Sequence, residues 1–222
     1  MPLLLLLVIG IAAYFIYTLY MKETKRTQEL KRTVEAGNFE KIIEQVKKSN
    51  RGDKDKSVAF ALARSYFYTN EPQLFFAQKK NFLALLAREK DLAAKQAILQ
   101  LELMEIVLLY VEEKTAQADK AWQELSLRNL ELKRLAAEGN VVDLYFICEL
   151  IHAFYGGRYE KVEENAATLK EIVFEVNKKT IFTHYLCRVY EAQGREEEIA
   201  PLIKQISAGD NYYWDLIDQW YE

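Results

Sequence analysis

The N-terminal segment restricts the fold of this chain more than any other part of its sequence. From residue 3 to residue 20 it contains no charged side chain. As a helix, this run would span about 27 Å, close to the thickness of a bilayer's hydrocarbon core. Its second half carries three aromatic side chains of the kind enriched at membrane interfaces, Tyr14, Tyr17 and Tyr20. We therefore expect one transmembrane helix within residues 1–21 and a soluble domain over residues 22–222.

The basic residues beside this segment predict its direction. None precedes it, and the nearest three that follow it are Lys22, Lys25 and Arg26. Because Lys and Arg are enriched on the cytoplasmic side, we expect a single-pass cell-membrane protein with its N-terminus outside and its C-terminal domain in the cytoplasm. The three tyrosines and three cations should lie at the membrane interface, where the cations can contact anionic lipid headgroups. A bacterial plasma membrane is the first assignment, and a mitochondrial outer-membrane receptor is the less favoured one.

Two other interpretations of the apolar segment compete with the anchor. A cleaved signal peptide normally starts with a basic region, and no basic residue precedes Leu3. A buried helix of a soluble protein can also be apolar on all sides. The length of the run and its basic flank favour the anchor over both.

The remaining sequence predicts helices. The whole chain contains only 8 Gly and 3 Pro, whereas all-β folds use many of both in their turns. Turn signals such as Gly37-Asn38 separate stretches in which apolar residues recur at helical spacing. We expect an all-α fold of five helical pairs: 22–36 with 38–49, 57–69 with 72–88, 91–112 with 115–137, 140–155 with 158–174, and 178–193 with 195–207. A closing helix over 212–221 should cap the last pair, which has no neighbour to cover its apolar face.

Two of the turns share a motif that indicates a repeat. Residues 37–41 read Gly-Asn-Phe-Glu-Lys, and residues 157–161 read Gly-Arg-Tyr-Glu-Lys. A small residue, Cys187, stands seven positions before the turn at Gly194. This pattern resembles the tetratricopeptide repeat family, which pairs two antiparallel helices in about 34 residues. The resemblance implies an α-solenoid of about five irregular helical hairpins over residues 24–207.

The sequence shows no catalytic signature. It contains no phosphate-binding loop, dinucleotide-binding motif or nucleophile elbow. Its two histidines, His152 and His184, each lie within one helical turn of a cysteine, Cys148 and Cys187 respectively. These four side chains could form a tetrahedral zinc site if both pairs faced one gap. Packing of the cysteines as small hydrophobes is the stronger explanation, so we expect no enzyme, no cofactor and no metal.

The distribution of charge argues against a nucleic-acid partner. Residues 22–56 hold eleven Lys and Arg against seven Asp and Glu, whereas residues 158–222 hold eight against thirteen. The chain is therefore basic beside the apolar segment and acidic far from it. A nucleic-acid-binding protein normally concentrates its positive charge on one face, and this sequence does not.

Stacked helical pairs form concave surfaces that bind peptides or protein segments. We therefore expect a membrane-anchored, non-enzymatic adaptor that binds a protein or peptide at the cytoplasmic membrane face. Candidate groove residues on the first helices of the pairs are Phe60, Arg64, Phe67, Tyr145, Phe182 and Arg188. Core packing is the competing role of each aromatic. The alternatives are a structural subunit of a membrane complex, including a homo-oligomer, and an enzyme with an unrecognised site.

Overall fold

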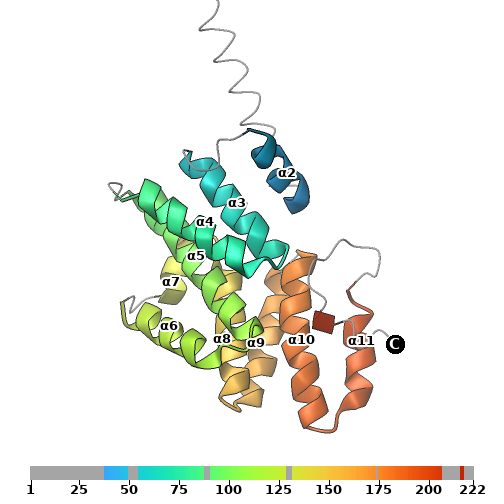
Figure 1. Cartoon of the computed structure of the whole chain (residues 1–222). Helices are drawn as coiled ribbons and strands as arrows, with labels where there is room; N and C mark the ends of the chain where they lie inside the picture. Colours follow the sequence, from blue (N-terminus) through green and yellow to red (C-terminus); the bar gives the residue numbers. More distant parts are fainter. Residues whose placement is uncertain are drawn as a thin grey trace, which may run out of the picture.

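The computed structural model of this chain describes residues 38–49, 55–87, 91–128, 132–173, 175–206 and 216–217. Within these stretches the chain forms helices and turns and no β-strand (Figure 1). The elements are α2 (Phe39–Ser49), α3 (Lys56–Tyr68), α4 (Pro72–Leu85), α5 (Leu92–Val111), α6 (Thr115–Arg128), α7 (Leu132–Glu138), α8 (Val142–Tyr155), α9 (Tyr159–Ile172), α10 (Val176–Ala192), the 3₁₀ turn η1 (Glu196–Glu198) and α11 (Ile199–Ile203). The prediction of an all-helical fold is confirmed for this part of the chain.

The predicted anchor and its interface residues lie outside the described residues, as does the helix expected over 22–36. In the stretches that the structure describes, no helix combines the length and the apolar character needed to cross a membrane. Most of the closing helix expected over 212–221 also lies outside them. Two of its residues are described, and of these Ile217 is fully buried while Leu216 packs against the core.

Two helix boundaries differ from the prediction. The segment 115–137, expected as one helix, contains two helices, α6 and α7; both contact α5 and α8, and Leu132 and Ala136 of α7 are buried. The segment expected over 195–207 begins as η1 and continues as the five-residue α11. The apolar spacing continues across both breaks, so periodicity alone did not reveal them.

Local chemistry sets the starts of α3, α4 and α5. Asp55 and Asp91 precede α3 and α5, and their carboxylates accept hydrogen bonds from the first backbone N–H groups, at 2.8 Å from Ser57 and 2.7 Å from Ala94. Pro72 begins α4, where its missing N–H leaves no helical bond unmade. These signals are local in sequence, which is why the helix positions were predictable.

The helices pack in sequence order. Each of the pairs α3 with α4, α5 with α6, and α8 with α9 forms a hairpin, and the second helix of each contacts the first helix of the next. The first helices also contact one another in turn, α3 with α5, α5 with α8, and α8 with α10 (Figure 1). The core runs through this row of first helices, whose fully buried residues include Phe67, Leu103, Met104, Ile147 and Ile151.

A buried charge joins the two ends of this row. The ammonium group of Lys178 on α10 forms ion pairs with Asp143 on α8 and with Glu175. It also lies 5.9 Å from the centre of the Tyr68 ring at the end of α3. The Tyr68 ring in turn stacks on Phe39 of α2 at 4.2 Å. The C-terminal end of α3 therefore meets the N-terminal end of α10, although 110 residues separate Tyr68 from Lys178.

Candidate functional site

The six predicted groove residues do not share one exposed surface. Phe60 and Arg64 lie together, with the guanidinium 5.9 Å from the ring, and Phe60 also packs against Phe82 at 5.3 Å. Phe67 is fully buried and Phe182 is 3% exposed, so both belong to the core. Their assignment to a groove is therefore corrected: apolar packing between neighbouring helices explains them.

The other two predicted residues, Tyr145 and Arg188, each contact an aromatic side chain of a neighbouring helix. Tyr145 is half-buried, with its ring 5.7 Å from that of Trp122. The Arg188 guanidinium lies 4.7 Å from the centre of the Phe154 ring, a cation–π contact between α10 and α8. Of the six, the structure brings only Phe60 and Arg64 together.

The four Cys and His side chains are held apart by other partners. The Cys148 thiol lies 3.3 Å from the carbonyl oxygen of Leu103, and the His184 Nδ1 lies 2.7 Å from that of Leu216. Burial raises the pKa of the Cys187 thiol to about 12 and that of the Cys148 thiol further, so both are neutral thiols in this metal-free structure. Over the described stretches, no three such side chains form a metal-binding group. The zinc alternative is not supported.

A polar triangle at the junction of α5, α6 and α8 was not predicted. The Asp119 carboxylate accepts a hydrogen bond from the Tyr110 hydroxyl at 2.6 Å and lies 2.9 Å from Nδ1 of His152. The third side, from Tyr110 to His152, is 3.0 Å. Burial and the Asp119 carboxylate raise the pKa of Tyr110, which remains a neutral donor. The triangle ties α6 to the row of first helices, and its members are too far apart in sequence for any motif to reveal them.

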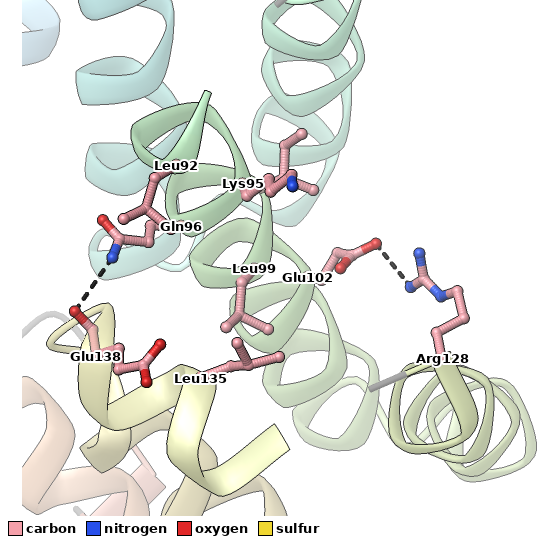
Figure 2. Close-up of a pocket in the computed structure, with 9 residues that line it drawn as sticks. Leu92, Lys95, Gln96, Leu99, Glu102, Arg128, Leu135 and Glu138 are labelled. Atoms are coloured by element: carbon pink, nitrogen blue, oxygen red, sulfur yellow. Dashed lines mark hydrogen bonds and ion pairs between the residues drawn. The ribbon is translucent and has the colours of Figure 1, made fainter. Parts of the chain in front are cut away.

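A cleft lies between α5, α6 and α7, beside the N-terminal half of α5 (Figure 2). Its volume is about 450 Å³. Leu92 and Leu99 line it from α5 and Leu135 lines it from α7. Leu92 at the rim is 65% exposed, whereas Leu99 deeper in the cleft is 8% exposed and Leu135 is half-buried.

Charged side chains border this apolar floor. Arg128 at the end of α6 pairs with Glu102 of α5 at 2.9 Å, on the side opposite α7 in Figure 2. On the α7 side, the side-chain amide of Gln96 donates to the carbonyl of Glu138 at 3.1 Å, and the Glu138 carboxylate pairs with Arg134 at 3.0 Å.

One rim cation differs from the others. Lys95 lies between Leu92 and Leu99 on the same face of α5, and its side chain is exposed. Within the part of the chain that the structure describes, its ammonium group has no ion-pair partner. The cleft therefore combines three leucines with one lysine whose ammonium group can form an ion pair with a carboxylate of a partner.

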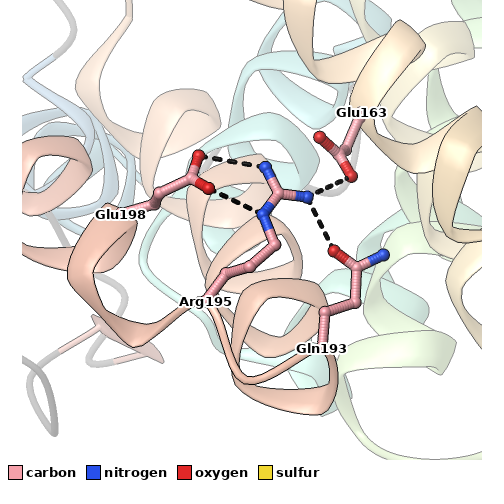
Figure 3. A network of polar contacts seen from close by, with 4 residues as sticks. All are labelled: Glu163, Gln193, Arg195 and Glu198. Carbon is pink, nitrogen blue, oxygen red and sulfur yellow. Dashed lines mark hydrogen bonds and ion pairs between the residues drawn. The ribbon is translucent and has the colours of Figure 1, made fainter.

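A second polar group lies at the turn after α10 (Figure 3). The Arg195 guanidinium pairs with both oxygens of Glu198, at 2.7 and 3.0 Å, and with Glu163 of α9 at 2.8 Å. It also donates to the Gln193 side chain at 2.7 Å and lies 4.3 Å from the Tyr190 ring. The hydrogen bond from Arg195 lowers the pKa of Glu198. Because these partners already engage the guanidinium, the group holds the last turn against α9 and offers no open site.

Comparison with known proteins adds no assignment: the chain matches no protein-family profile, no curated protein and no solved structure. The cleft on α5 is therefore the candidate site on its geometry alone. Sequence reasoning missed it because it depends on where α6 ends and where α7 packs. The one available signal was the spacing of Leu92, Lys95 and Leu99, which places them on one face of a helix.

Proposed function

We propose that this chain is a non-enzymatic adaptor, anchored to a membrane by its N-terminal apolar segment, that binds a protein partner through the cleft between α5, α6 and α7. The observation that carries this proposal is the apolar floor of the cleft, which its own chain leaves open to solvent at Leu92. Exposed apolar surface bordered by polar side chains is typical of protein-binding sites.

The arrangement of the helices supports a tetratricopeptide-like α-solenoid as the scaffold. Consecutive hairpins that pack on one another, with their first helices stacked in a row, are what such an array requires. In this proposal the cleft arises where the third hairpin departs from the regular repeat, because its second helix divides into α6 and α7. The binding site is thus an irregularity of the array, distinct from the groove residues first expected.

The proposal is tested by crosslinking in cells followed by mass spectrometry. The full chain, its Leu92→Glu variant and its Leu74→Glu variant are compared at equal expression. Leu74 on α4 is the matched control, since it is also exposed, at 42%, and does not line the cleft. A partner crosslinked by the wild type and the control but lost from Leu92→Glu is the expected result.

Two outcomes contradict the adaptor proposal. Partner recovery that is the same for all three chains would remove the cleft from the interaction. Recovery of only a second copy of this chain would replace the adaptor with the self-associating structural subunit. A variant lacking residues 1–21 that stays in the membrane fraction would separately refute the anchor.

A further inference from the structure

Two turns of α5 line the cleft. Leu92 and Leu99 are seven positions apart, so they lie about two turns and about 10 Å apart along α5. Figure 2 shows Arg128 at the end of α6 beside Glu102 of α5, with Leu135 of α7 on the other side of the cleft. In their hairpins, α4 covers α3 and α9 covers α8. The N-terminal half of α5, in contrast, lies beyond Arg128, the last residue of α6 that forms an ion pair with α5.

The charges around the cleft indicate which charged side chain a bound partner should carry. Glu102 is already paired with Arg128, and Glu138 with Arg134, so the two rim carboxylates are neutralised. Lys95 is not neutralised, although it stands among the leucines of the floor. A partner that covers this floor brings Lys95 into a less polar environment, where a carboxylate would offset the cost of removing its ammonium group from water.

We propose that the cleft receives an amphipathic helix whose apolar stripe packs on Leu92, Leu99 and Leu135 and whose flanking Asp or Glu pairs with Lys95. This inference rests on the proposed function and names the chemistry of its partner. A helix presents apolar residues at positions i, i+3 or i+4, and i+7, which match the two turns of α5 that line the cleft. Such a partner takes the place that an unbroken second helix of the hairpin would fill.

The test uses the full chain purified in detergent and two fluorescent helical peptides of about 14 residues. Both peptides carry a stripe of leucines; one has Glu beside the stripe and the other has Lys at the same position. Fluorescence polarisation should show saturable binding of the Glu peptide, about fivefold tighter than that of the Lys peptide. The Leu92→Glu variant should weaken binding of the Glu peptide at least tenfold, and the Leu74→Glu control should leave it unchanged.

Reversal of the rim charge gives the decisive comparison. In the Lys95→Glu variant the preference should invert, so that the Lys peptide binds more tightly than the Glu peptide. The same peptide order in wild type and Lys95→Glu, or no saturable binding of either peptide to the wild type, would overturn the inference. If crosslinking in cells still depends on Leu92 while neither peptide binds, the adaptor proposal survives and only the helical partner is refuted.

Discussion

At the scale of single residues, backbone conformation explains where the hairpins turn. Five residues in the described stretches have positive φ angles, and each follows the end of a helix: Asn70, Glu113, Asn140, Gly157 and Gly194. Glycine and asparagine tolerate this left-handed conformation, and four of the five positions carry one of them. Glu113, at φ +59°, is the exception. Its Cβ makes this conformation unfavourable, although its backbone N–H donates to the Tyr110 carbonyl at 3.0 Å.

Replacement of Glu113 by Gly should therefore stabilise the protein. We expect the free energy of unfolding to rise by about 0.5–1 kcal/mol, the relief of left-handed strain less the added flexibility of the unfolded chain. Urea denaturation of the full chain measures it. The matched control is Glu112→Gly, one residue earlier at φ −76°, which should lower stability. A lower urea midpoint for Glu113→Gly would show that the Glu113 side chain stabilises the folded chain by more than its left-handed backbone destabilises it.

At the scale of elements, α10 is contacted both by residues that precede it in the sequence and by residues that follow it. His184 lies near its middle, where Nδ1 contacts the carbonyl oxygen of Leu216, and Ile217 is fully buried next to it in sequence. Burial lowers the pKa of His184 below its ordinary value of 6.5, so the neutral ring is favoured in the folded chain. The neutral ring with its proton on Nδ1 donates to the Leu216 carbonyl.

This environment predicts a pH dependence of stability. Below about pH 6.5 the unfolded chain takes up a proton on His184 before the folded chain does. The contribution of His184 to the free energy of unfolding is therefore complete above that pH. It falls as the pH decreases toward the folded-state pKa of His184, and then levels off. Thermal denaturation between about pH 8 and pH 5 should show a smaller decrease for His184→Asn, which retains a donor and does not titrate. Parallel curves for the two proteins would exclude His184 as the titrating group.

At the scale of the whole molecule, the Lys178 ion pairs connect parts that the chain order separates. Lys178→Met leaves the Asp143 carboxylate buried without its cation, and we expect this to cost about 3 kcal/mol in unfolding free energy. Adding Asp143→Leu to that variant should recover most of the loss, because it removes the unpaired charge. Urea denaturation of the single and double variants tests both steps.

The matched control for this prediction is Lys48→Met. Lys48 also pairs with a carboxylate, that of Glu44 at 2.6 Å, but both side chains are mostly exposed. Its removal should leave the midpoint unchanged, since exposed pairs contribute little. A double variant as unstable as Lys178→Met alone would show that Lys178 acts through its packing against Tyr68 instead of through its charge.

What the sequence determined by itself was the approximate position of most helices in the described stretches, because turn signals and apolar spacing act over a few residues. The caps at Asp55 and Asp91, the proline at Pro72 and the turn residues at Gly157 and Gly194 all act within one helical turn, so their effect is local in the sequence. Amphipathic spacing located the apolar stripes, although it could not say which aromatic would be buried.

The tertiary structure alone decided the features that join distant residues. The division of α6 from α7, the cleft beside α5, the triangle around Asp119 and the pairing of Lys178 with Asp143 all depend on packing between elements. A helical period is the same on either side of such a break, and an ion pair carries no local signal. The apolar floor at Leu92 is exposed for the same reason: the second helix of its hairpin ends before reaching it, a fact of three-dimensional packing.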